Sequence, residues 1–153
     1  MKAMDKLDKT ENWLACLKDN GYRVTAPRQV VVETIASSQY ILSPLDVYEL
    51  ARQQYPYLGL VTVYRTMEKL EELGCLQRVH LPTSCQGFIA AVAGHQHLLI
   101  CENCGLVTYF AGDTEKMDAL IEDVAEKSGF IIRDHWLQLF GVCENCRALK
   151  KKS

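Results

Sequence analysis

Two copies of the tetrapeptide Cys-Glu-Asn-Cys, at residues 101–104 and 143–146, restrict the possible folds of this chain more than any other feature. A Cys-x-x-Cys turn holds two sulfurs at the spacing of one edge of a tetrahedron around zinc, and two such turns complete a four-thiolate shell with no position for water. One pair alone could equally be a redox dithiol, but the duplication and the glycine after the first pair favour structural zinc. The predicted ligands are Cys101, Cys104, Cys143 and Cys146.

The residues around the two cysteine pairs predict a small mixed domain. Apolar runs at 97–100 and 106–110 predict strands on either side of the first pair, and 130–142 predicts a further strand before the second. Between them, residues 114–128 carry apolar side chains at helical spacing. We therefore expect an α/β domain over residues 84–153, locked together by its zinc because binding energy at such a site is folding energy.

The first half of the chain follows a different pattern, in which helical segments come first. Apolar spacing predicts a helix ending near Gly21, and the segments Thr25-Ala-Pro27 and Ser43-Pro44 each place a capping side chain before an early proline, as at many helix starts. Residues 60–73 carry apolar side chains in steps of three and four and predict a fourth helix. Its outward positions are expected to include Thr66.

Two extended runs follow the fourth helix. Residues 75–81 and 85–92 alternate loosely on either side of a Pro-Thr-Ser turn, which predicts a two-stranded ribbon. Several short helices followed by such a ribbon outline a winged helix-turn-helix domain over residues 1–83, and the whole chain is expected to have an α+β fold. The alternative for residues 60–73 is an ordinary core helix with one solvated face.

Composition indicates a globular chain in a reducing compartment. The sequence is 48% apolar and 24% charged, as in folded domains. It begins without the apolar segment of a signal peptide and has no stretch apolar enough to span a membrane, so we expect neither secretion nor membrane insertion. Seven cysteines, an odd number, favour metal ligation over disulfides and hence a cytoplasmic location. The net charge of −2 gives no bulk support for nucleic-acid binding, so any DNA affinity must come from local placement of charge.

Four stretches resemble the ferric uptake regulator superfamily, together covering about residues 12–147. They are Gly21-Tyr-Arg-Val-Thr25-Ala-Pro27-Arg28, Thr62-Val-Tyr64-Arg65-Thr66 with 70–74, His95-Gln-His97-Leu-Leu-Ile-Cys101-Glu-Asn-Cys104-Gly105, and Leu139-Phe-Gly141-Val-Cys143. The second and third, in this order and at this distance, are highly specific. The resemblance implies a homodimeric, metal-responsive repressor of metal uptake or homeostasis genes. Its winged helix would bind an AT-rich palindrome in double-stranded DNA, and its C-terminal domain would dimerise.

The resemblance also assigns residues to DNA. Tyr64 and Arg65 match the recognition-helix pair that contacts a thymine and the phosphate backbone, and Thr62 belongs to the same motif. Arg23 matches a basic residue that reaches the minor groove, and Arg28 falls on a backbone-contacting arginine. These roles fit general rules, since an aromatic ring can pack on a thymine methyl and arginine supplies phosphate contacts. Each could instead be an ordinary surface arginine or a half-buried tyrosine.

The usual regulatory metal site of that family is not retained here. In the family, a His-x-His ends three residues before the first cysteine and is joined by an acidic residue just after Cys-x-x-Cys-Gly. In this sequence those positions hold Gln96, Leu98 and Tyr109, and residues 40–42, where a histidine is common, read Tyr-Ile-Leu. Any regulatory metal is therefore expected to use other ligands.

Ligand-capable side chains lie one step out of that register. His95 and His97 share one face of a strand at period two, and His80 and Cys85 flank the expected turn, where a cysteine resembles that of zinc-uptake regulators. These four predict an exchangeable regulatory site at the hinge between the domains. A thiolate with imidazoles favours Zn²⁺ over Fe²⁺ or Mn²⁺.

A second ligand set is the alternative. His135 matches a histidine that some members use for a further metal, and Asp113 or Glu115 would be its carboxylate partner. His80 and His135 could equally be ordinary polar residues. Cys16 and Cys75 lie in apolar runs and are expected to be small buried hydrophobes.

Other functional classes have less support in the sequence. An enzyme would need a nucleophile, or an open metal position, beside a general base, and no such group stands out, so the chain is expected not to be an enzyme. A zinc-stapled redox or hydrolytic enzyme is the alternative from a different class. An iron- or peroxide-responsive regulator, or one that has lost sensing, is the alternative with the same fold.

Overall fold

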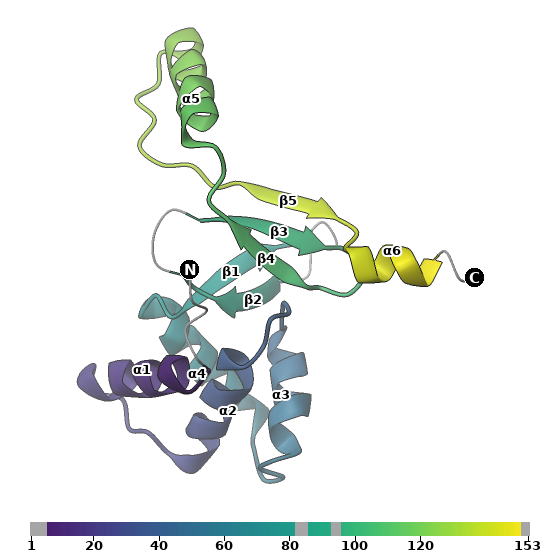
Figure 1. The fold of residues 1–153 in the computed structure, drawn as a ribbon. Helices are drawn as coiled ribbons and strands as arrows, with labels where there is room; N and C mark the ends of the chain where they lie inside the picture. The colour runs from purple at the N-terminus through teal and green to yellow at the C-terminus, as the bar shows by residue number, and fades with distance from the viewer. Residues whose placement is uncertain (1–5, 82–85, 93–95, 151–153) are drawn as a thin grey trace. The chain divides into compact units, whose positions relative to one another are not determined.

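The computed structural model describes residues 6–81, 86–92 and 96–150 (Figure 1). Contacts divide the chain into two compact units, Met1–Val92 and Ala93–Ser153. Both strands of the hairpin lie within the first of these units, because the second strand pairs with the first. No helix among the described residues is long and apolar enough to cross a membrane.

The N-terminal unit contains the predicted helices followed by a hairpin (Figure 1). Its elements are α1 (Lys6–Asp19), α2 (Ala26–Ala36), α3 (Pro44–Arg52), α4 (Leu60–Glu72), β1 (Leu76–His80) and β2 (Gln86–Ala90). The strands are antiparallel, with register from Leu76 opposite Ala90 to His80 opposite Gln86. The winged helix-turn-helix outline is therefore confirmed.

Local chemistry explains where these helices begin. Ser43 and Asp46 form a reciprocal capping box at the start of α3: the Ser43 hydroxyl accepts from the Asp46 N–H at 3.2 Å, and the Asp46 carboxylate accepts from the Ser43 N–H at 2.7 Å. Thr25 occupies the same position before α2, but its side chain makes no capping hydrogen bond, so there the helix start rests on Pro27.

One apolar core holds the four helices and the hairpin together. Its fully buried members include Leu17, Val31, Ile35, Val47, Val63, Met67 and Leu70. Phe88 from β2 joins the same cluster, and β2 is also tied to the α2–α3 connection by paired backbone hydrogen bonds between Leu42 and Phe88. The expectation that Thr66 faces outward is wrong: it is fully buried, and its hydroxyl donates to the Thr62 carbonyl at 2.7 Å.

The C-terminal unit is a three-stranded sheet with two helices. Its elements are β3 (His97–Cys101), β4 (Val107–Phe110), α5 (Thr114–Ser128), β5 (Gln138–Gly141) and α6 (Glu144–Lys150). The strand order is β4-β3-β5, with β3 antiparallel to β4 and parallel to β5. The α+β fold is thus confirmed for the whole chain.

Two parts of this unit differ from the prediction. The strand expected over residues 130–142 is only Gln138–Gly141, because its partner β3 begins at His97 and pairing runs only from Leu98 opposite Gln138 to Cys101 opposite Gly141. Helix α6 was not expected. It begins inside the second cysteine turn, which the sequence predicted only as a metal-binding turn, and the Arg147 N–H donates to the Cys143 carbonyl there.

Replacing Gly87 by Ala should destabilise the N-terminal unit. A Cβ at this position would lie 2.0 Å from Cγ2 of Ile41, and a β-branched side chain cannot easily turn away. We expect a loss of about 1–3 kcal/mol, measured by thermal unfolding. Gly141→Ala is the control, because a Cβ there would meet nothing within 4 Å; equal losses in the two variants would contradict this packing.

Candidate metal centres and nucleic-acid interface

The strands β3 and β5 end at the same edge of the C-terminal sheet (Figure 1), and each leads into one of the two cysteine pairs. Because β3 and β5 are parallel neighbours, both run toward that edge, and Cys101 at the end of β3 lies opposite Gly141 at the end of β5. The Glu102 N–H donates to the Gly141 carbonyl at 2.8 Å, which links the two turns. The first turn closes through a Gly105 N–H to Cys101 carbonyl bond of 2.9 Å, and Gly105 has the positive φ of 72° that favours glycine.

The four sulfurs have the spacing of a zinc site. The Sγ atoms of Cys101, Cys104, Cys143 and Cys146 all lie within 4.8 Å of one another. The sulfurs of Cys104 and Cys143 are 3.8 Å apart, too far for a disulfide and equal to the edge of about 3.8 Å that a tetrahedron with Zn–S bonds of about 2.3 Å requires. The residues present therefore fit a tetrahedral zinc ion.

Without a cation, the thiols of this cluster have strongly different acidities. The Cys143 N–H donates to the Cys101 sulfur at 3.3 Å, and this hydrogen bond above all lowers the pKa of Cys101 to about 6. The neighbouring thiols of Cys143 and then Cys104 raise the pKa of Cys146 to about 12. Four adjacent thiolates repel one another, so a bound dication is what permits all four to be charged.

The predicted hinge ligands are only partly described by the structure. His80 is exposed at the end of β1, opposite Gln86. His97 is buried at the start of β3, with 3% of its surface exposed. Cys85 and His95 lie outside the described residues.

His97 instead lies against His135, the histidine of the alternative ligand set. Their ring centres are 5.3 Å apart, close to the separation of about 5 Å for two imidazoles on one tetrahedral metal with Zn–N bonds of about 2.1 Å. Gly112 packs on the same imidazole: a Cβ there would lie 3.4 Å from Nε2 of His97. The Nε2 side of the His97 ring therefore lies beside the backbone at Gly112, just before α5.

The carboxylates of the alternative set stand at the start of α5. Asp113 caps the helix, accepting from the Lys116 N–H at 3.4 Å and pairing with the Lys116 ammonium at 3.0 Å. That side-chain contact above all lowers the pKa of Asp113. Glu115 is exposed in the first turn. Within the described residues, the four cysteines are the group in which at least three metal-ligating side chains lie close together. Neither Asp113 nor Glu115 forms such a group with His97 and His135.

Helix α4 presents the predicted DNA-contacting residues on the face opposite its core. Val63, Met67 and Leu70 are buried, whereas Tyr64 is 46% exposed. Arg65 beside it is exposed and Thr62 is half-buried. The helix is therefore anchored on one side and free to contact a ligand on the other, as a recognition helix must be.

The two other predicted contacts lie around the start of α2. Arg23 is exposed in the loop after α1. Arg28 is half-buried in the first turn, and its Nη1 donates to the Arg23 carbonyl at 2.5 Å. Its buried Nε has no hydrogen-bond partner among the described residues. Arg28 thus holds the loop that carries Arg23.

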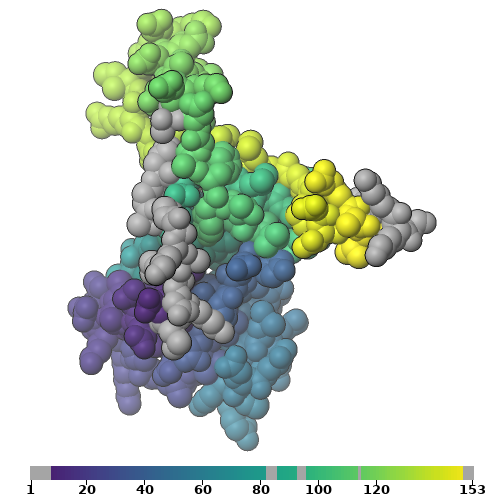
Figure 2. Space-filling view, viewed as in Figure 1, coloured from purple at the N-terminus to yellow at the C-terminus, as the bar shows by residue number. Residues whose placement is uncertain are grey.

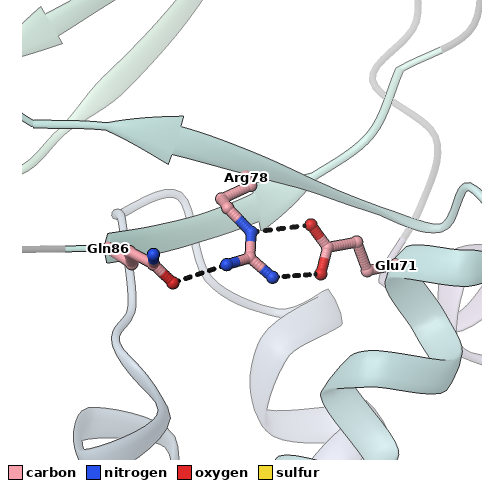
Figure 3. Close-up of polar contacts among 3 residues, drawn as sticks. All are labelled: Glu71, Arg78 and Gln86. Atoms are coloured by element: carbon pink, nitrogen blue, oxygen red, sulfur yellow. Dashed lines mark hydrogen bonds and ion pairs between the residues drawn. The ribbon is translucent and has the colours of Figure 1, made fainter.

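Sequence patterns gave no sign of one further polar network, shown in Figure 3. Arg78 on β1 forms two parallel hydrogen bonds with the Glu71 carboxylate at the end of α4, of 2.8 and 2.6 Å, and a third with the Gln86 side chain on β2, of 2.5 Å. The bond from Arg78 above all lowers the pKa of Glu71. Only the charges of Glu71 and Arg78, seven residues apart on either side of Gly74, could have suggested the pair.

Comparison with known proteins agrees with this geometry. The sequence matches the model of the Ferric uptake regulator family over residues 19–140. The ferric uptake regulation protein of Neisseria meningitidis serogroup A is 34% identical over 142 residues, which cover 92% of this chain and 97% of that protein.

Solved structures share the fold. The ferric uptake regulator of Helicobacter pylori, described as having three functional metal binding sites, superposes with a TM-score of 0.71 at 24% identity, covering 96% of this chain and 97% of that one. A zinc uptake regulator complexed with zinc and DNA superposes with a TM-score of 0.69 at 21% identity, covering 97% and 99%.

This chain belongs to the ferric uptake regulator family. That membership confirms the resemblance seen in the motifs, and the family is one of transcription regulators rather than enzymes. The four-cysteine cluster of the C-terminal unit is a site that could hold its zinc.

Replacing Cys101 or Cys143 by Ser should release tightly bound zinc and unfold the C-terminal unit, because three thiolates cannot complete the tetrahedron. Zinc content by elemental analysis and thermal melting measure the two effects. Cys16→Ser, in the other unit, is the control and should keep the zinc. A serine variant of Cys101 that keeps one zinc per chain and melts like the unmodified protein would refute the structural-zinc assignment.

Proposed function

We propose that this protein is a metal-dependent transcriptional repressor that binds double-stranded DNA and controls metal uptake or homeostasis genes, with zinc as the sensed metal. The observation that carries the proposal is the exposed face of α4, where Tyr64 and Arg65 stand on a helix whose other face is fixed in the core. The zinc uptake regulator that shares this fold is itself described as complexed with DNA, which supports the same use of α4 here.

The side chains on and near α4 supply two kinds of DNA contact. Tyr64 offers an aromatic ring to a thymine methyl in the major groove, and Arg65 offers charge to a phosphate. Arg23, in a loop held by Arg28, would enter the narrow minor groove of an AT-rich site. Local placement of this kind is needed because the net charge of the chain is −2.

The operator in this proposal is a palindrome read by a homodimer. Helix α5 and the segment after it are drawn in green to yellow-green in Figure 2. Large apolar side chains are exposed along them, namely Leu120, Val124, Phe130, Ile131 and Trp136. Soluble chains rarely leave so many large apolar groups in water, so a second copy of the C-terminal unit is the natural cover. Two copies related by a two-fold axis would present two α4 helices to two half-sites.

A second, exchangeable metal would regulate binding. The contact between His97 and His135 supports a site in the C-terminal unit that uses both imidazoles with Asp113 or Glu115. His80, Cys85 and His95 remain ligands predicted from the sequence alone. Imidazoles suit zinc and iron alike, so our preference for Zn²⁺ over Fe²⁺ or Mn²⁺ rests on the thiolate of Cys85 that the sequence predicts as a further ligand. A metal regulates only if it binds the DNA-competent conformation more tightly than the others.

The roles of Tyr64 and Arg65 predict different losses. Arg65→Ala should weaken binding to all duplexes about equally and reduce the salt slope by about one, as expected for a phosphate contact. Tyr64→Ala should relax the preference for thymine at one position with little change in slope.

Both variants are measured by fluorescence anisotropy on a duplex that the unmodified protein selects from a randomised pool, across salt concentrations and single base changes. Glu68→Ala, at an exposed position of the same helix, is the control for loss of a surface side chain. Identical effects of the Tyr64 and Arg65 variants on slope and base preference would contradict the assigned roles.

Removing either imidazole of the second site should abolish the response of DNA binding to added zinc. His97→Ala and His135→Ala are each expected to keep the tightly bound zinc and to lose the rise in DNA affinity that zinc produces, because a ligand is missing. His80→Ala distinguishes the two ligand sets. If the regulatory metal binds His97 and His135, the DNA affinity of the His80 variant should respond to zinc as that of the unmodified protein does. A lost response in the His80 variant with a normal one in the His135 variant would favour the hinge set instead.

A further inference from the structure

The guanidinium of Arg78 connects the recognition helix to both strands of the hairpin (Figure 3). Nε and Nη2 donate to the two carboxylate oxygens of Glu71 on the last turn of α4, at 2.8 and 2.6 Å, and Nη1 donates to the side-chain oxygen of Gln86 on β2, at 2.5 Å. Cζ of Arg78 lies over the ring of Phe88, 5.0 Å from its centre, and Phe88 is the residue opposite Arg78 in the hairpin register. One side chain of β1 thus contacts both α4 and β2.

This contact is the second of two polar anchors on the hairpin, beside the apolar packing of Leu76 and Phe88 in the core. The first is on β2, where Phe88 and Leu42 exchange backbone hydrogen bonds of 3.0 and 2.9 Å. It does not include β1, which is joined to α4 by the packing of Leu76 and by the short connection around Gly74, where the Cys75 N–H donates to the Leu70 carbonyl at 2.8 Å. The bidentate pair removes the remaining freedom, because two parallel hydrogen bonds fix orientation as well as distance.

We propose that Arg78 is a positioning residue for DNA recognition: its bond to Glu71 sets the angle between the hairpin and α4, so that both engage one duplex together. The proposal rests on the proposed DNA-binding function. Three of the five N–H groups of Arg78 already bind protein acceptors on Glu71 and Gln86, so we assign Arg78 a role through these partners and not through a phosphate. About a third of each charged side chain is exposed, so the pair adds little to stability and its value is geometric.

Charge removal on either side tests the proposal. Arg78→Gln and Glu71→Gln should each reduce affinity for the selected duplex about tenfold, because the two reading elements are no longer held at one angle. Binding to a random-sequence duplex should fall much less, and the salt slope should stay the same, because no phosphate contact is lost. Thermal melting should change little in either variant. Lys69→Gln is the control, since Lys69 forms its ion pair within α4, with Glu72.

Exchanging the two charges provides the decisive experiment. The double variant Glu71→Arg with Arg78→Glu restores the ion pair in the opposite sense and should recover much of the lost affinity. If Arg78 contacted a phosphate directly, Arg78→Gln would lower the salt slope by about one and Glu71→Gln would bind normally. The double variant would then not recover affinity. This pattern would overturn the proposal. If the unmodified protein binds no duplex, the proposed function and the role of Arg78 are both wrong. If it binds and the single variants match it, only the role of Arg78 is wrong.

Discussion

The parallel pairing of β3 with β5 is the contact on which the C-terminal unit depends. It places Cys101 opposite Gly141, so that the two cysteine turns leave the sheet at one edge. The strands are short, and the sheet has only β4 as its third member, which makes a four-thiolate metal the main cross-link between segments about forty residues apart. Hydrogen bonding with the neighbouring thiols of Cys143 and Cys104 raises the pKa of Cys146 to about 12, and a bound dication would favour the thiolate instead. A metal at the four cysteines would therefore stabilise the sheet that positions them.

The N-terminal unit is held by different forces. Its helices share an apolar core, and α4 is fixed by Val63, Met67 and Leu70 while Tyr64 and Arg65 remain outside. The hairpin is attached by backbone bonds at Phe88 and by the ion pair of Arg78. A rigid helix with an attached ribbon suits the reading of a DNA groove, and membership in the ferric uptake regulator family agrees with this use.

The sequence predicted the structural features that depend on residues close together in the chain. It missed several features that depend on contacts between distant segments. Helix α5 has the predicted bounds, because its cap Asp113 and the positive-φ Gly129 are local signals. The strand at 138–141 is shorter than expected because β3 limits it, and the burial of Thr66 follows from tertiary packing that periodicity does not describe. The four cysteines were found from spacing alone. The contact of His97 with His135 joins two strand-flanking positions that no sequence spacing relates, so the sequence supplied only the two candidates.

The central claim is that a second metal, beyond the four-cysteine zinc, controls DNA binding. The most direct measurement is a zinc titration of the full chain after mild chelation has left one tight zinc, followed by anisotropy of a labelled duplex that the protein selects from a random pool. The account predicts that affinity rises at least about tenfold as one further equivalent of zinc binds, which corresponds to a coupling of about 1.4 kcal/mol. Equal affinity with the single tight zinc and with excess zinc would contradict it.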